Sequence, residues 1–204
     1  MIEDAHRASE VISSVRAMFG NNQRKKEPLR LNDLINDVLS IIHGEFESHH
    51  IDLQLELDES VPDVLGDRVQ IQQILLNLFT NAVEAMTSVD GHQRLLSIKS
   101  EVNDQDGALI TIKDSGSGIA APNVDRIFDA FFTTKPHGMG MGLSICRSIV
   151  ENHGGSLWAE RGNPCGAVFR MKLPVGAGRF PGTPSIQSHD PAGMLAGFGS
   201  VSGS

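Results

Sequence analysis

The sequence predicts an α+β domain built as a two-layer sandwich of helices on a sheet. Segments with apolar residues at helical spacing are interspersed with segments in which apolar and polar residues alternate one by one. Two of the alternating segments flank the turn signal Asp106-Gly107, which favours an antiparallel hairpin. Apolar residues make up 40% of the 204 residues, enough for one substantial core. Helices and antiparallel strands in this order are typical of a two-layer α+β sandwich.

The first predicted element is a helix over residues 2–19. Its apolar seam consists of Ala8, Ile12, Val15 and Phe19, and Gly20-Asn21-Asn22 is a stop signal. Such a helix either packs on its own domain or forms the second half of a dimerising helical hairpin. The basic hinge Arg24-Lys25-Lys26 and Pro28 separate it from the predicted domain and favour the hairpin.

The remaining elements are predicted from periodicity and turn residues. Helices are predicted near 31–43, from about 67 to 86 and over 142–153, and strands over 51–57, 95–102, 108–113, 155–160 and 167–173, with a long loop over 120–141. After Pro174, half of the residues are Gly, Ser or Pro, which indicates a disordered tail. The predicted organisation is therefore a helix over 1–22, a folded α+β domain over 23–174 and a tail over 175–204.

Composition excludes several classes of function. The formal net charge of -8 and the lack of a basic stripe argue against a nucleic-acid surface. Cys146 and Cys165 form neither a disulfide framework nor a zinc motif, which favours a reducing compartment. No apolar run approaches the roughly 20 residues of a membrane span, and the start lacks the pattern of a signal peptide. We expect this segment to be soluble and cytoplasmic, without membrane contact.

Asn77 and Asn81 stand at positions i and i+4 of the long helix predicted over 67–86. That helix presents Ile71, Ile74, Leu75, Leu78 and Ala82 to the core, so both amides project from one edge of its apolar face. They are either two tolerated surface amides or part of a site. A carboxamide oxygen is a suitable neutral ligand for Mg²⁺, which takes few protein ligands when phosphates supply the others.

A second segment, Asp114-Ser115-Gly116-Ser117-Gly118, comes directly after a predicted strand. A carboxylate there can accept a hydrogen bond from an exocyclic amino group, while the glycines let the backbone approach a planar base. Gly116 to Ala121 also spells the G-x-G-x-x-A dinucleotide fingerprint. That interpretation fails because Pro122 and a loop stand where a helix should begin, and position 134 is Thr instead of an acidic residue.

The third and fourth segments are the long loop and the glycines at its end. Gly138-x-Gly140-x-Gly142 precedes a predicted helix, where backbone N–H groups and the helix dipole form a phosphate cradle. It is not a Walker loop, because no Lys-Ser/Thr comes after the last glycine. In the loop, Phe128 and Phe131 either anchor the ends on apolar surface or are ordinary core aromatics, and Lys135 is either a solvated lysine or a contact to a γ-phosphate. A loop of this length in a compact domain is usually functional, often as a lid.

Together these segments resemble the N, G1, F and G2 boxes of the histidine-kinase-like ATPases (GHKL superfamily), and within it the catalytic domain of two-component sensor histidine kinases. The resemblance implies the Bergerat ATP-binding fold preceded by one dimerisation helix, with ATP and Mg²⁺ bound. By the same resemblance Asn81 ligates Mg²⁺, Asn77 contacts phosphate or a metal-bound water, Asp114 reads adenine, and Asn77, Asn81 and Lys135 are the catalytic residues. The other ATP-site residues that it implies are Gly116, Gly118, Ile119, Phe131, Thr133, Thr134, Gly138, Met139, Gly140, Met141, Gly142 and Leu143. The stretch Thr133 to Gly138 is similar to the lid of nitrogen- and oxygen-sensing histidine kinases.

The resemblance also implies an activity and partners. The expected reaction transfers the γ-phosphoryl group of ATP to a histidine on a dimerisation helix not included in this chain, for relay to an aspartate of a response regulator, with homodimerisation through the N-terminal helix. The family's acceptor is a His followed by an acidic residue on a helix. Only His189-Asp190 matches, in the tail, so we expect no self-labelling. The alternatives are a degenerate ATP-binding scaffold, or a protein-serine kinase of the anti-sigma type, against which the helix over 2–19 counts because those kinases lack a dimerising hairpin.

Overall fold

The computed structural model describes residues 26–89, 91, 93–103, 107–135 and 138–175. The helix predicted over 2–19 lies outside the described residues, as does the tail beyond Val175. Val175 itself forms an isolated antiparallel bridge with Val64. The domain bounds predicted from the sequence, including the tail over 175–204, stay a prediction.

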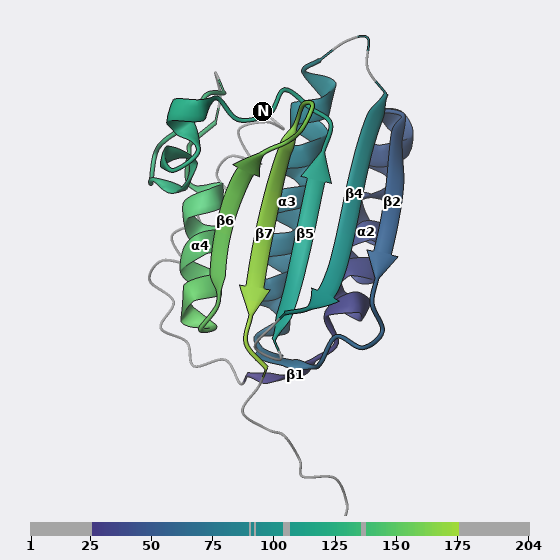
Figure 1. Ribbon diagram of the computed structural model, residues 1–204, viewed down its shortest axis with the longest axis vertical. Coiled ribbons are helices and arrows are strands. Elements are labelled where there is room, and N and C mark those ends of the chain that lie inside the picture. The colour runs from purple at the N-terminus through teal and green to yellow at the C-terminus, as the bar shows by residue number, and fades with distance from the viewer. Residues whose placement is uncertain (1–25, 90, 92, 104–106, 136–137, 176–204) are drawn as a thin grey trace, which may run out of the picture.

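The described chain forms a five-stranded sheet with helices on one of its faces, and a separate two-stranded sheet. The elements in order are β1 (Glu27–Leu29), α2 (Leu31–Ser48), β2 (Ile51–Leu57), β3 (Val64–Gly66), α3 (Arg68–Thr87), β4 (Arg94–Val102), β5 (Ala108–Asp114), the 3-10 helices η1 (Ala121–Asn123) and η2 (Arg126–Phe128), α4 (Gly142–Asn152), β6 (Ser156–Arg161) and β7 (Ala167–Leu173). The sheet has five strands in the order β2-β4-β5-β7-β6. Figure 1 shows α2, α3 and α4 behind this sheet, which confirms the predicted two-layer α+β sandwich.

The sheet is mixed: the predicted antiparallel hairpin of β4 and β5 is present, and β2 adds a parallel pair for which the sequence had indicated no partner. Strand β2 pairs with β4 in parallel, with Ile51 opposite Arg94, whereas the other pairs of this sheet are antiparallel. The parallel pair is possible because α3 provides the crossover between the two strands. The short pair β1 and β3 was not predicted, because three residues each are too few to show alternation. Helix α2 also runs five residues past the predicted end at His43, to Ser48.

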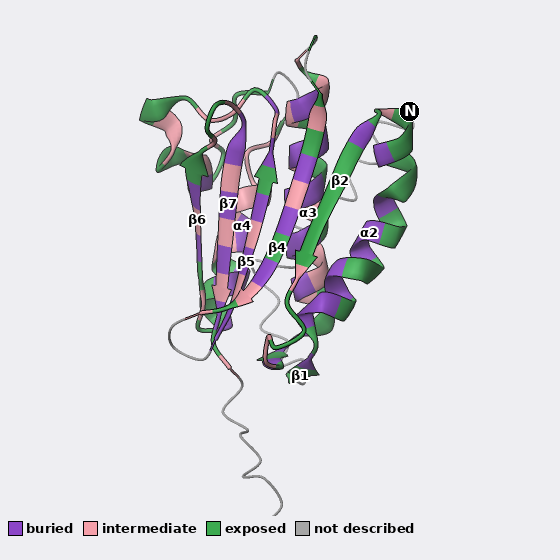
Figure 2. Cartoon of the chain, turned by 45° about the vertical axis from the view of Figure 1, so that its right-hand side comes forward, coloured by how far each residue is buried: buried purple, intermediate pink, exposed green. Residues whose placement is uncertain are grey.

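The core lies between the helices and the face of the sheet that they cover. Its largest fully buried side chains are Phe79, Leu31, Leu34, Ile35, Ile71, Ile74, Leu75, Leu78, Met86, Leu96, Ile98 and Ile110. Figure 2 shows the buried residues facing inward on α2 and α3, while β2 at the sheet edge is mostly exposed. Leu53 and Leu55 alternate as a strand should but are 37% and 42% exposed, whereas Ile51 and Leu57 at the two ends of β2 pack against the core.

A polar contact ties α3 to α4. Asp67 caps α3 by accepting hydrogen bonds from the N–H groups of Val69 and Gln70, at 2.9 and 3.2 Å. The backbone N–H of Asp67 donates to Nε2 of buried His153 at 3.1 Å, and Nδ1 of His153 lies 2.8 Å from the carbonyl of Ile149. His153 therefore carries its proton on Nδ1 and links the end of α4 to the start of α3. The opposite ends of these helices frame the candidate site.

Candidate nucleotide site

Helix α3 presents the two predicted amides as a hydrogen-bonded pair. Nδ2 of Asn81 donates to Oδ1 of Asn77 at 2.9 Å, and both amides lie at the boundary of the buried face. The spacing of four residues places them one above the other on one face of the helix, as predicted. This bond fixes the orientation of the Asn81 amide, so its oxygen points away from Asn77 and is available to a cation.

Asp114 is the last residue of β5 and is 2% exposed. Its Oδ1 accepts hydrogen bonds from the backbone N–H groups of Gly116 and Ala167, at 2.9 and 3.2 Å. These two bonds hold the carboxylate in one orientation, in which Oδ2 is left for a ligand's donor. Burial raises the pKa of the Asp114 carboxyl, and the two backbone donors oppose that shift.

The raised pKa of Asp114 predicts how its replacement changes stability with pH. A carboxyl whose pKa is higher in the folded state stabilises folding below its unfolded pKa near 3.8, and that contribution is lost as pH rises through the folded pKa. Asp114→Asn is therefore expected to melt above the wild type at pH 7, with the difference shrinking as pH falls toward 4. Thermal unfolding of both proteins across this range measures it. A difference that grows on acidification would contradict the prediction.

The glycines after Asp114 are required by packing within the protein. A Cβ on Gly116 would lie 2.5 Å from the carbonyl carbon of Ala85 on α3, and one on Gly118 would lie 2.6 Å from the carbonyl oxygen of Gly166. The N–H of Ser117 donates to the same Ala85 carbonyl at 3.1 Å. The sequence argument expected these glycines to let backbone approach a base. That expectation stays a prediction, and the structure adds a second reason, a close approach of loop backbone to α3 and to the turn before β7.

The second glycine segment ends at an uncapped helix terminus. Met141 is the N-cap residue of α4, and no side chain accepts a hydrogen bond from the first turn of the helix. The backbone N–H groups of that first turn are therefore available to an anion. A Cβ on Gly142 would lie 2.5 Å from Nδ2 of Asn77. Gly140 has φ +67°, and a Cβ there would meet the carbonyl carbon of Phe131 at 2.5 Å. This helix terminus thus lies directly beside the amide pair of α3.

The loop between the two glycine segments contains short 3-10 turns and one buried aromatic anchor. It contains η1 and η2, which were not predicted. Phe128 is buried, and the Arg147 guanidinium lies 4.5 Å from its ring centroid, so Phe128 anchors the loop as expected. Phe131 is 74% exposed with φ +68°, so the expectation that it anchors the loop was wrong. Its N–H donates to the carbonyl of Gly140 at 2.9 Å, and the chain turns there.

Lys135 reaches across to α3. Its Nζ donates to Oδ1 of Asn81 at 2.8 Å and also pairs with the carboxylate of Glu84. The sequence argument expected a phosphate contact for Lys135 and did not single out Glu84. The spacing from Asn81 to Glu84, three residues on one helix, is the signal that would have placed Glu84 at the site.

The remaining predicted residues fall into two groups. Ile119, Met141 and Leu143 are half-buried and pack against the core. Met139 is half-buried, and Thr134 and Gly138 are exposed, while the hydroxyl of Thr133 accepts a hydrogen bond from the N–H of Lys135 at 3.1 Å. These residues line the loop and its approach to α4.

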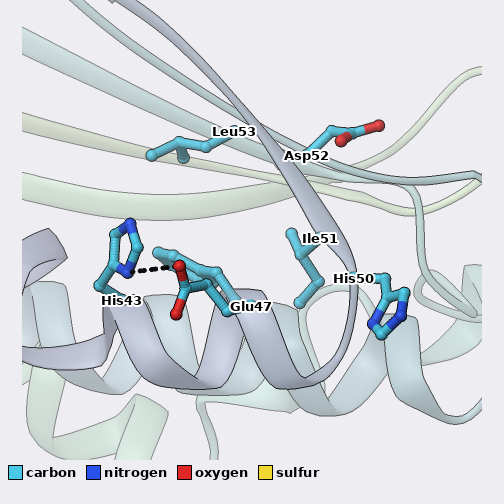
Figure 3. A pocket seen from close by; sticks show the side chains of 7 residues that line it. His43, Glu47, His50, Ile51, Asp52 and Leu53 are labelled. Carbon is cyan, nitrogen blue, oxygen red and sulfur yellow. Dashed lines mark ion pairs between the residues drawn. The ribbon is translucent and has the colours of Figure 1, made fainter.

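A separate surface hollow of about 260 Å³ lies between the end of α2 and the start of β2. Figure 3 shows the paired His43 and Glu47 beside His50, Ile51, Asp52 and Leu53. It contains none of the residues predicted for nucleotide binding. The first glycine segment follows β5, the central strand, and the second precedes α4, which packs on β6 at the edge opposite β2. The hollow at the β2 edge is therefore no part of the candidate site.

The segments of the site share α3 as their support. Gly142 packs at Asn77, Lys135 contacts Asn81, and Gly116 packs at Ala85. These three positions of α3 are four residues apart and therefore lie on one face of the helix. Segments separated by tens of residues thus converge on two turns of one helix.

This convergence agrees with the comparison to known families. Residues 66–177 match the family described as histidine kinase-, DNA gyrase B- and HSP90-like ATPase. The chain belongs to this family. Its sequence is 39% identical over 173 residues to the sensor protein FixL of Bradyrhizobium diazoefficiens and 36% identical over 176 residues to the sensor histidine kinase TmoS of Ectopseudomonas mendocina. The matches cover 85% and 86% of this chain but only 34% and 18% of those proteins.

Solved structures show the same fold. The nucleotide-free catalytic domain of the histidine kinase ThkA superposes with a TM-score of 0.66 at 35% identity, covering 75% of this chain and 97% of that one. ThkA in complex with the response regulator TrrA matches with a TM-score of 0.66 at 30% identity, over 83% of this chain and 48% of that one. The chain therefore has the fold of histidine-kinase catalytic domains. No helix in the described ranges has both the length and the apolar character needed to cross a membrane.

The residues present fit ATP and Mg²⁺. Asp114 keeps one carboxylate oxygen for a ligand, the first turn of α4 is uncapped, and the Asn81 oxygen already holds a cationic group. These features supply an acceptor for an amino group, donors for an anion and a neutral ligand for a metal.

Proposed function

We propose that this chain is the Mg·ATP-binding catalytic core of a two-component sensor histidine kinase. Its reaction is transfer of the γ-phosphoryl group of ATP to a histidine on a dimerisation helix, from which an aspartate of a response regulator receives it. The observation that carries the proposal is the convergence of the glycine segments and Lys135 on Asn77, Asn81 and Ala85 of α3. The family match and the complex of ThkA with TrrA support it.

Each group of the site has a role in this proposal. Asp114 accepts a hydrogen bond from the adenine amino group through Oδ2, and the N–H groups at the start of α4 bind phosphate. Asn81 holds Mg²⁺, which neutralises charge on the phosphates. Asn77 orients Asn81 through their 2.9 Å hydrogen bond. Catalysis of phosphoryl transfer rests mainly on positioning and charge stabilisation, so this set requires no covalent chemistry from the protein.

The amide at Asn77 also predicts slow hydrolysis. A carboxamide does not accept a proton at neutral pH, so no base at this position activates water. We expect ATP turnover below about 1 s⁻¹ when no acceptor is supplied, at the low end of ordinary enzyme rates. Release of phosphate from ATP measures it. Faster turnover, reproduced after removal of contaminating ATPases, would contradict the assignment.

A phosphotransfer assay tests the proposal against its main alternative, an ATP-binding scaffold without transfer. The chain is mixed with radiolabelled ATP and a separately produced histidine-bearing helical hairpin from a sensor kinase. The kinase proposal expects label on the hairpin that is stable to base and labile to acid, and none on this chain. A hairpin whose histidine is replaced by glutamine is the control. Binding of ATP without any transfer favours the scaffold.

We propose further that residues 2–19 dimerise as a helix in the parent protein. The support is the apolar seam in their sequence and the basic hinge after it. Equilibrium sedimentation of the chain, with and without these residues, tests this part separately from phosphotransfer.

A further inference from the structure

Lys135 and Asn81 form a contact that the expected roles of these residues do not explain. Lys135 lies 54 positions after Asn81, yet its ammonium donates to the amide oxygen of Asn81 at 2.8 Å and pairs with the carboxylate of Glu84. Glu84 stands three residues after Asn81 on α3, so both oxygens face the same point beside the helix. An amide oxygen and a carboxylate oxygen together therefore hold one cationic group.

The oxygen that Lys135 occupies is the one available for a metal. Nδ2 of Asn81 donates to Asn77, which leaves Oδ1 as the atom of this amide that can bind a cation. Two positive groups at one amide oxygen would repel each other at contact distance. Occupation of Asn81 by the lysine and by Mg²⁺ is therefore mutually exclusive.

We infer that Lys135 is a tethered competitor of the metal, held on Asn81 by Glu84 until Mg²⁺ with its nucleotide displaces it. In this inference Glu84 is a positioning residue: it holds the lysine, and it is assigned no contact with nucleotide or metal. The displaced ammonium is then free to move to the phosphates, so arrival of the metal and release of the loop at Lys135 are one event. This inference rests on the proposed function.

The contact of Lys135 with Glu84 and Asn81 is weak enough for Mg²⁺ to displace the lysine. The Lys135 and Glu84 side chains are 47% and 50% exposed, so solvent screens the pair and its contribution is modest. The hydrogen bond to Asn81 adds a further modest amount. Together they are expected to disfavour metal binding by about three- to tenfold. A contact of this strength is populated in the nucleotide-free chain and still yields to a phosphate-bound Mg²⁺.

The test compares ADP binding with and without the metal. ADP lacks the γ-phosphate, so a direct contact of Lys135 with that group does not enter the measurement. Calorimetric titrations in Mg²⁺ and in EDTA give, for each protein, the ratio of the two dissociation constants. Lys135→Met is expected to raise the preference for Mg·ADP over metal-free ADP by about three- to tenfold, because Asn81 is no longer occupied. Glu84→Gln is expected to change this preference in the same direction.

A second Lys–Glu pair provides the matched control. Lys99 and Glu101 on β4 form an exposed pair, with exposed fractions of 45% and 34% against 47% and 50% for Lys135 and Glu84, but lie on a strand away from the site. Lys99→Met is expected to leave the metal preference unchanged. Thermal unfolding of each variant checks that it is folded.

The outcomes separate this inference from the proposed function. An unchanged or lower metal preference in Lys135→Met overturns the competition, and a lower preference in Glu84→Gln shows that Glu84 supports the metal and overturns its assigned role. Failure of the wild type to bind ADP in either buffer overturns the proposed function and this inference with it. Binding in both buffers with equal preferences in every variant overturns the inference alone.

Discussion

Asp114→Asn is expected to lose Mg·ATP affinity by about tenfold or more while the protein stays folded. Oδ1 of Asp114 accepts from the N–H groups of Gly116 and Ala167, and the amide oxygen of an asparagine can keep both bonds. The other oxygen becomes an NH₂ group, which faces the adenine amino group donor to donor. Loss of a charge-assisted hydrogen bond costs about 1.5 kcal/mol or more, which corresponds to this change in dissociation constant. Calorimetric titration of Mg·ATP measures it.

Asp67→Asn is a matched control for this substitution. Asp67 is also buried, at 6% exposure, and its Oδ1 likewise accepts two backbone hydrogen bonds, from Val69 and Gln70. It caps the far end of α3, so its replacement should alter stability and leave ATP affinity within about twofold. Equal loss of affinity in both variants would mean that Asp114 acts through folding and does not contact adenine.

The order of the helices and strands could be predicted because apolar residues recur at regular helical or alternating spacing in most of them. The helix over 67–86 and the strand ending at Asp114 were placed within a residue or two. The pairing of β2 with β4 was not predictable in the same way. Alternation in Ile51–Leu57 identifies a strand, but it carries no information on the direction of its neighbour.

The residues of the site were predictable from motifs, whereas their contacts were not. Glycine segments and paired amides indicate a nucleotide site, since few other sites need that combination. The partner of Lys135 depends on how the loop folds back on α3, which no local pattern encodes. Phe131 shows the same limit, because aromatic residues favour burial on average and the positive φ at this turn instead directs it to solvent.

Gly166→Ala is expected to destabilise the protein by about 3 kcal/mol and to impair nucleotide binding as well. A Cβ at Gly166 would lie 1.8 Å from the carbonyl oxygen of Asp114, and φ at this position is +82°. The left-handed conformation costs an alanine about 1 kcal/mol, and forcing extra volume into packed backbone costs about 1–3 kcal/mol more. For a domain of this size the melting temperature should fall by about 6–12 °C.

Gly91→Ala separates the two causes of that loss. Gly91 has the same φ of +82°, but no described atom lies within 4 Å of the position its Cβ would take. Its replacement by alanine should therefore cost only the free energy of holding an alanine in the left-handed conformation, about 1 kcal/mol. Thermal unfolding and Mg·ADP titration of both variants measure the difference. Because the turn at Gly166 packs directly against Asp114, the residue proposed to read adenine, Gly166→Ala should weaken binding even at temperatures where it is fully folded. Equal shifts in melting temperature for the two variants would show that the turn yields to the added methyl group, and that the position of Asp114 does not depend on this contact.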